Sequence, residues 1–275
     1  MSLRPLTVDK AGRKYWEQSW TDRPETLPVD PSDRRLSAYV DRRLHEMFCS
    51  VFSGAPSTRR LLEIGCGRSR WLPYFGKHHG FSVAGVDYSP TGCQQAEALL
   101  AAAQVEGRVI CADFFDPPKE LLESFDVVWS LGVMEHFDDT GNVAAAFARF
   151  LRPGGVMITV IPNMRWVIGG LQVLLNAPVY RIHVPLSLRE LVRAHEHAGL
   201  NTEDARYFLA TNFWVVNVDQ PPGIRRVLGR ALVGVMGRLS AMIWAFEERF
   251  VRIPSSRVYS PYLLCVARKP RTTAP

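Results

Sequence analysis

The chain has 275 residues, of which 47% are hydrophobic and 22% charged, which is ordinary for a soluble globular protein with one large core. The net charge is +6, but only 5 of the 33 basic residues are lysines and the charges are scattered, so we do not expect nucleic acid as a partner. The first ten residues have no apolar core and no run of about 18 apolar residues occurs, which argues against a secretion signal and a spanning helix. The five cysteines form no CxxC pair and no metal-ligand spacing. We therefore predict reduced thiols, a cytoplasmic location and no metal site.

The first region, residues 1–56, is polar and interrupted by three prolines. Apolar residues at helical spacing predict a helix over residues 32–52. We interpret this region as an N-terminal helical cap, followed by one catalytic domain over residues 57–270.

From residue 57 onward the pattern changes to apolar runs that alternate with helical stretches. Helices are predicted over residues 93–104 and 142–151. The predicted strands are 61–64, 81–86, 109–111, 125–129 and 156–161. Such alternation indicates an α/β fold with a doubly wound, mostly parallel sheet.

Beyond this alternation, two segments are interpreted as insertions, over residues 162–186 and 219–260. The first is apolar and irregular. Ser187 and Glu190 then form a capping box that predicts a helix to about residue 198. Strands are predicted over residues 205–208, with an extension through 214–218, and over 262–267.

The strongest chemical signal is a strand that ends in an acidic residue and a Gly-x-Gly turn. Glu63 precedes Gly65, Cys66 and Gly67. Glycine permits a tight turn and lets a ligand approach the backbone closely. This turn alone would be weak evidence, so its value depends on the residues that follow.

Acidic and aromatic residues follow the next strands at the spacing of a nucleoside site. Asp87 ends the second strand, where a carboxylate can accept hydrogen bonds from both ribose hydroxyls. Asp113 and Phe114 follow the third strand, and a loop over residues 130–137 follows the fourth. Open α/β sheets bind ligands at this carboxyl edge.

With these motifs in order, residues 59–161 resemble the core of the class I (Rossmann-like) S-adenosylmethionine (SAM)-dependent methyltransferases. The resemblance implies a seven-stranded sheet whose last strand is antiparallel, and SAM as the cofactor. One departure is Ser69, where the family often has a third glycine. The cofactor-binding residues that the resemblance implies, including two aromatic residues of a covering N-terminal helix, are Glu63, Gly65, Cys66, Gly67, Asp87, Tyr88, Asp113, Phe114, Ser130, Leu131, Tyr15 and Trp20.

A nicotinamide dehydrogenase is the rival interpretation. Its fingerprint, G-x-G-x-x-G, needs a third glycine for close packing of helix and strand. Arg70 stands at that position. The bulky side chain argues against a dinucleotide site, whereas SAM has no pyrophosphate and tolerates the change.

The acceptor side is less defined by the sequence. His136 could act as a general base or only shape its loop, and His183 lies in a segment expected to overhang the acceptor. His195 and His197 are expected at the surface. We predict methyl transfer to a small apolar or aromatic acceptor, with a lipid or isoprenoid acceptor at a membrane surface, or a non-catalytic SAM-binding role, as alternatives.

Residues 224–250 within the second insertion carry apolar residues at helical spacing, with arginines on another face. The segment could be a lid, a dimer contact or a helix on an anionic membrane surface. The sequence does not define the oligomeric state.

Overall fold

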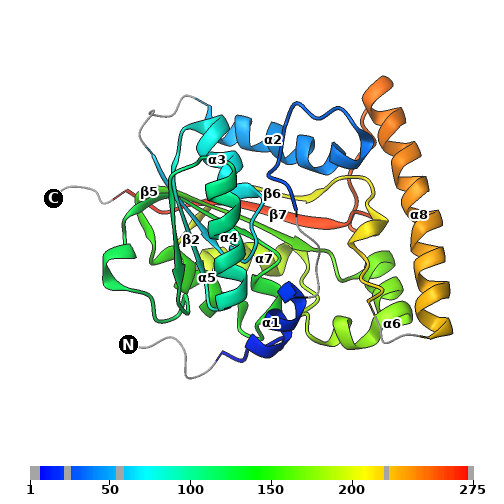
Figure 1. The fold of residues 1–275 in the computed structure, drawn as a ribbon, viewed down its shortest axis with the longest axis horizontal. Helices are drawn as coiled ribbons and strands as arrows, with labels where there is room; N and C mark the ends of the chain where they lie inside the picture. The colour runs from blue at the N-terminus through cyan, green and yellow to red at the C-terminus, as the bar shows by residue number, and fades with distance from the viewer. Residues whose placement is uncertain (1–6, 22–25, 54–58, 220–222, 272–275) are drawn as a thin grey trace.

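One seven-stranded sheet forms the centre of the computed structural model, which describes residues 7–21, 26–53, 59–219 and 223–271 (Figure 1). Its strand order is β3-β2-β1-β4-β5-β7-β6. The strands are β1 (Arg60–Ile64), β2 (Ser82–Asp87), β3 (Gly107–Cys111), β4 (Phe125–Leu131), β5 (Leu151–Pro162), β6 (Asn201–Phe208) and β7 (Tyr262–Arg268).

The first five strands pair in parallel, and β7 is antiparallel to both of its neighbours, β5 and β6. This arrangement confirms the predicted fold class. Because β7 runs antiparallel, its amino end lies at the same edge of the sheet as the carboxyl ends of the parallel strands. The first residues of β7 can therefore contribute to a ligand site at that edge.

Helices cover both faces of the sheet. The α-helices of the described residues, not all of which lie on a face of the sheet, are α1 (Arg13–Thr21), α2 (Tyr39–Phe52), α3 (Trp71–His79), α4 (Pro90–Ala102), α5 (Thr140–Ala148), α6 (Trp166–Arg181), α7 (Leu188–His197) and α8 (Ile224–Arg249). Successive strand residues alternate between the two faces, so Leu61 packs in the core under α2 and α3, and Leu62 in the core under α5 and α7. Both leucines are fully buried, as expected for strands covered on both sides.

Two elements and the burial of one histidine differ from the sequence predictions. Residues 162–186 are not irregular, because α6 fills most of them, with a kink at Asn176 two residues before Pro178. The strand extension over residues 214–218 is wrong, since Phe213–Val215 is a 3-10 helix, η5. His195 is fully buried rather than at the surface, and only His197 is exposed.

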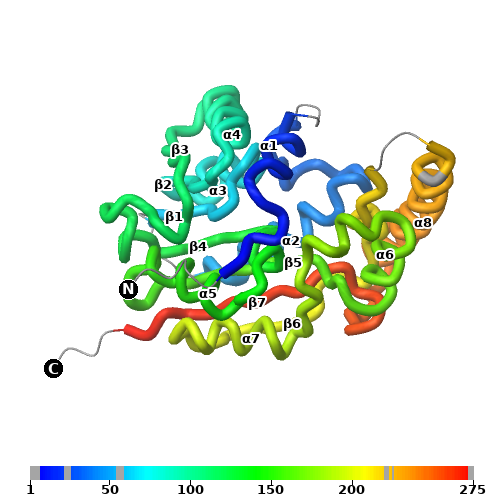
Figure 2. The backbone as a smooth tube through the Cα atoms, turned by 90° about the horizontal axis from the view of Figure 1, so that it is seen from below, coloured from blue at the N-terminus to red at the C-terminus, as the bar shows by residue number. Residues whose placement is uncertain are grey.

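The predicted N-terminal cap divides into two parts with different positions. Helix α2 packs into the sheet core through buried Leu44, Met47 and Phe48. Helix α1 instead lies across the carboxyl edge of the sheet, and Figure 2 shows it between α4 and the α2 side of the molecule. The predicted boundary at residues 56 and 57 lies outside the described residues.

Helix α8 lies beside α6, at the end of the molecule opposite the carboxyl end of β7 (Figures 1 and 2). Trp244 of α8 is 2% exposed, stacks on Tyr39 at 5.1 Å and donates a hydrogen bond to the Thr211 carbonyl. Tyr39 also donates to Glu247 at 2.8 Å. These contacts fix the C-terminal half of α8 to the core, which argues against a lid that moves as a whole.

Candidate functional site

Two neighbouring cavities open at the carboxyl edge of the sheet. The larger has a volume of about 380 Å³ and the smaller about 320 Å³. Gly65, Leu131, Tyr262 and the indole of Trp20 line both. The two cavities are therefore parts of one cleft, with Trp20 between them, and each part lies within the size range of ligand pockets.

The Gly-x-Gly turn forms the floor of this cleft. Gly65 has φ +71°, and a Cβ there would lie only 2.4 Å from the Cγ2 methyl group of Val133. A Cβ on Gly67 would lie 2.7 Å from Nε1 of Trp20 and 3.0 Å from Oδ2 of Asp87. Both positions therefore require glycine, one for its conformation and one for the close approach of other groups.

Asp87 stands at the end of β2 and is held by backbone donors. Its Oδ2 accepts from the Gly67 N–H at 2.9 Å and its Oδ1 from the Ser89 N–H at 2.8 Å. Burial raises the pKa of Asp87 above its usual value, while these two hydrogen bonds oppose the rise. Each oxygen keeps a lone pair for a ligand hydroxyl, because an ionised carboxylate offers about four acceptor sites.

Glu63 lines the smaller cavity. Its Oε2 accepts a hydrogen bond from the Ser69 hydroxyl at 2.5 Å, and that hydroxyl accepts from the N–H groups of Trp71 and Leu72. Ser69 thus connects Glu63 to the first turn of α3. Burial raises the pKa of Glu63 to about 8. The serine that departs from the family pattern therefore has a structural role of its own.

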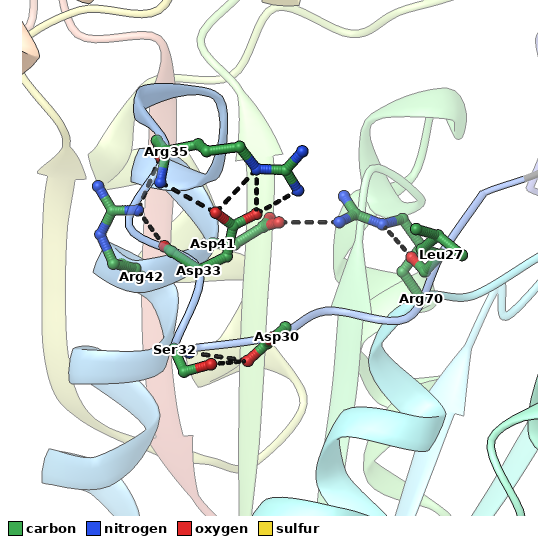
Figure 3. Close-up of polar contacts among 8 residues, drawn as sticks. All are labelled: Leu27, Asp30, Ser32, Asp33, Arg35, Asp41, Arg42 and Arg70. Atoms are coloured by element: carbon green, nitrogen blue, oxygen red, sulfur yellow. Dashed lines mark hydrogen bonds and ion pairs between the residues drawn. The ribbon is translucent and has the colours of Figure 1, made fainter.

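Arg70 joins three segments at the rim of the smaller cavity (Figure 3). Its Nε donates to the Leu27 carbonyl at 2.7 Å, and its Nη2 lies 3.0 Å from Oδ2 of Asp41 in α2. The side chain that argued against a dinucleotide site thus anchors the chain before α2 to the start of α3.

The aromatic residues of α1 cover the cleft. Trp16 and Trp20 stack at 5.7 Å, and both line the larger cavity. Trp16 also meets the His136 ring edge-on at 5.0 Å. The Tyr15 ring packs against the Trp16 ring at 5.1 Å. Tyr15 therefore helps to position Trp16.

The remaining residues predicted to bind the cofactor do not all line the same cavity. Tyr88, Phe114 and Leu131 line the larger cavity. Asp113 lines a separate cavity of about 170 Å³, which Tyr88 also borders. Two residues, Cys66 and Ser130, are buried within the fold, at 0% and 1% exposure. A direct role for each of them stays a prediction.

A polar cluster lies at the acceptor end of the larger cavity. It consists of Glu135 and His136 from the 3-10 helix η4 (Met134–His136) and His183 from the loop after α6. The two imidazole rings are 4.4 Å apart, and Oε1 of Glu135 lies 3.9 Å from Nε2 of His136. Burial raises the pKa of Glu135 to about 8 and lowers that of His136 to about 3. The pKa of His183 is lowered for the same reason. The two predicted acceptor residues are therefore brought together.

Several cavity residues were missed by the sequence reasoning. Tyr262 lines both cavities because β7 runs antiparallel, and burial raises its pKa to about 12. Tyr262 could have been predicted at this edge, because it is the first residue of the last strand. Val215 could not, because it comes from η5, which the sequence reasoning took for a strand.

The cleft fits a nucleoside with an extended side chain. A carboxylate with free lone pairs at Asp87, a backbone approach that only glycine allows at Gly67 and the buried Glu63 lie along one cleft. SAM has the matching groups in this order, from ribose to the methionine side.

Residues 62–159 match the family model described as "Methyltransferase domain". Together with the sheet order and the Asp87 site, this match decides the class. The chain contains a class I SAM-dependent methyltransferase domain.

The relatives of this methyltransferase domain act on different molecules. Over 109 residues it is 32% identical to a ubiquinone biosynthesis O-methyltransferase of Rhodopseudomonas palustris (strain BisB18), covering 39% of this chain and 41% of that protein. Over 114 residues it is 29% identical to a 2-methyl-6-phytyl-1,4-hydroquinone methyltransferase of Synechocystis, covering 40% and 34%. The matches thus span less than half of these relatives.

Solved structures share the fold across nearly the whole chain. A geranyl diphosphate C-methyltransferase of Streptomyces coelicolor A3(2) has a TM-score of 0.59 at 16% identity, with 94% of this chain and 97% of that chain covered. The [4+2]-cyclase SpnF has the same score and identity, with 96% and 97% covered. At such identities the likeness shows the fold alone.

Proposed function

We propose that the protein transfers a methyl group from SAM to a small organic acceptor with an apolar body and a hydroxyl group. The larger cavity carries this proposal. It begins at Asp87, passes between apolar and aromatic walls such as Trp16, Val133 and Val215, and reaches the buried polar cluster. One cavity therefore joins the cofactor edge to a place for an acceptor, which a protein that only binds SAM would not need.

When bound, SAM supplies an electrophilic methyl group on a sulfonium sulfur. Asp87 would hold the ribose hydroxyls, and the turn from Glu63 to Gly67 would border the methionine side. Trp16 and Trp20 would cover the reacting groups and exclude water. Alignment and exclusion of water can supply much of the rate enhancement for such a transfer.

His136 and His183 would bind the acceptor hydroxyl. Their Nδ1 atoms lie 2.9 Å and 2.7 Å from the carbonyl oxygens of Ile182 and Val179. Because a carbonyl only accepts hydrogen bonds, Nδ1 carries the proton in each ring and Nε2 keeps its lone pair. Both residues line the cavity, so these lone pairs are available to an acceptor hydroxyl.

A lipid-like acceptor at a membrane surface is the second candidate. The outer face of α8 exposes large apolar side chains, among them Val227, Leu228, Val235 and Met242 at 61% to 70% exposure. Arg230 and Arg238 are also exposed on this helix, as suits an anionic surface. The phytyl hydroquinone named for one relative is an acceptor of this kind. The cytoplasmic location predicted from the cysteines stays a prediction.

By length and composition, residues 226–249 of α8 could also cross a membrane. Their contacts with α2 and η5 favour a helix that lies on the surface instead, because Trp244 and Ser240 are buried against the fold.

The test is methyl transfer from SAM to a panel of phenols and hydroquinones with and without isoprenoid tails, with products identified by mass. We expect methylated product from at least one hydroxyl acceptor, and less from the Asp87→Ala variant when the SAM concentration is limiting. Val215→Phe, which narrows the larger cavity, should raise KM for the acceptor and leave SAM affinity unchanged. SAM binding without transfer to any member of the panel would reject this acceptor class.

A further inference from the structure

A group of three buried side chains at the acceptor end of the larger cavity has the composition of a metal site. Each of Glu135, His136 and His183 offers one ligand atom, and these atoms lie within 4.8 Å of one another. The three residues are 1%, 4% and 7% exposed. Ligands of one tetrahedral zinc ion lie about 3.3 Å apart, so small side-chain rotations would close the group around an ion.

The hydrogen bonds around the histidines are those of metal ligands. A metal-bound histidine usually donates its other ring N–H to a carbonyl or a carboxylate, which fixes the ring and its tautomer. His136 does so to Ile182 and His183 to Val179. Both Nε2 lone pairs are thereby left for a metal ion, and with that ion bound the acceptor hydroxyl would bind the ion rather than the two imidazoles.

Glu135 supplies an independent observation. Its Oε2 is buried and accepts no hydrogen bond from any residue that the structure describes. A buried acceptor without a partner is destabilising, because it has given up its hydrogen bonds to water and gained none in return. Glu135 lines the cavity, so a cation there would satisfy this oxygen.

Backbone hydrogen bonds fix the three ligands relative to one another. The Val184 N–H donates to the Glu135 carbonyl at 2.6 Å, and the Lys10 N–H to the His136 carbonyl at 2.8 Å. Lys10 Nζ also donates to the His183 carbonyl at 2.9 Å. Three segments distant in the sequence are thus held together, as a preorganised site requires.

We propose that Glu135, His136 and His183 bind one divalent transition metal ion, of which Zn²⁺ is the best match. Two imidazoles favour zinc, iron or nickel over magnesium and calcium, which prefer oxygen ligands alone. Three protein ligands leave a coordination position open, as in catalytic zinc sites. That position faces the cavity and suits an oxygen atom of an acceptor. This last step, unlike metal binding itself, rests on the proposed function.

A second group of side chains could also bind a metal ion and consists of His45, Cys49 and His79. Its ligands must be removed before the first group can be tested. The Tyr74 hydroxyl already lies 2.7 Å from Nδ1 of His45 and 2.8 Å from Nε2 of His79. The Cys49→Ser/His79→Gln protein is therefore the parent for all measurements.

The experiment is titration of this metal-free parent with Zn²⁺ by calorimetry and with Co²⁺ by visible absorption, in the absence of SAM. We expect one equivalent to bind, with no thiolate-to-metal band, and Co²⁺ to quench tryptophan fluorescence through Trp16. His183→Gln and Glu135→Gln should each weaken binding at least about 100-fold. His195→Gln, a buried histidine outside the group, should leave it unchanged.

Circular dichroism of each variant checks that it folds. If the His183→Gln protein does not fold, the metal affinity of the Glu135→Gln protein alone tests the proposal. Parent protein that binds no Co²⁺ at millimolar concentration, or a folded Glu135→Gln protein with the affinity of its parent, would overturn the proposal. Because SAM and acceptor are absent, neither result depends on methyl transfer.

Discussion

Gly67 and Asp87 are joined by a hydrogen bond of 2.9 Å, from the Gly67 N–H to Oδ2 of the carboxylate. It connects the turn after β1 to the end of β2. The position of the Asp87 carboxylate therefore depends on the glycine turn, and we expect substitutions at either residue to weaken SAM binding.

Removing the Asp87 carboxylate should weaken SAM binding. Asp87→Ala eliminates up to two charge-assisted hydrogen bonds to the ribose, each worth about 1.5–3 kcal/mol, so we expect affinity to fall at least about 10-fold in calorimetry. Asp116→Ala, which removes an exposed carboxylate, controls for net charge. Equal affinities in the two variants would disprove this assignment.

Adding one methyl group at Gly67 should have a similar effect. In Gly67→Ala the Cβ would lie 2.7 Å from Trp20 and 3.0 Å from Oδ2 of Asp87, so one of them must move. We expect SAM affinity to fall at least about 10-fold, which is about 1.4 kcal/mol. Gly170→Ala, where a Cβ meets nothing within 4 Å, should bind SAM normally. A Gly67→Ala protein with unchanged affinity would mean that the ligand does not approach this turn.

His195 should make the stability depend on pH. It is fully buried between the Leu191 carbonyl and the Thr159 hydroxyl, and burial lowers its pKa from 6.5 to about 4. The unfolded chain therefore binds this proton below about pH 6.5 and the folded chain only near pH 4. His195 thus contributes stability above pH 6.5 that is lost as the pH falls toward 4.

The measurement is urea unfolding at pH 7.5 and pH 5. Between these values the free energy of unfolding should decrease by about 2 kcal/mol more in the wild type than in His195→Gln. His197→Gln, at an exposed position on the same helix, should follow the wild type. Parallel pH profiles for wild type and His195→Gln would show that burial of His195 does not shift its titration.

Charges on the outer face of α8 should test the membrane alternative. Val235 and Met242 are 61% and 70% exposed, so Val235→Asp/Met242→Asp should preserve the fold. If α8 lies on the membrane, the wild type should co-sediment with anionic vesicles at low salt, less at high salt, and the variant should not. Ala101→Asp/Ala102→Asp, with the same charge change on α4, should still bind. Wild-type protein that stays in the supernatant at low salt would exclude this candidate.

The sequence determined the sheet and the cofactor edge, because both depend on local patterns. Alternating apolar strands and helices allow few topologies, and the residues after parallel strands meet at one edge. Gly65, Gly67 and Asp87 could thus be placed without coordinates. The capping box at Ser187 and Glu190 likewise needs only neighbours in the chain, and it is present as predicted.

Only the tertiary structure decided which distant residues meet. His183 reaches His136 because the kinked α6 returns the chain to η4, and no spacing in the sequence encodes that return. His195 lies on an amphipathic helix, yet its ring is buried because Thr159 of β5 offers a hydrogen-bond partner beneath it. The burial of helix α8 likewise could not be predicted from the sequence. Its apolar pattern is continuous, and whether a given side is buried or exposed depends on the position of Tyr39, which stacks on Trp244. Packing partners, rather than residue type, determined these outcomes.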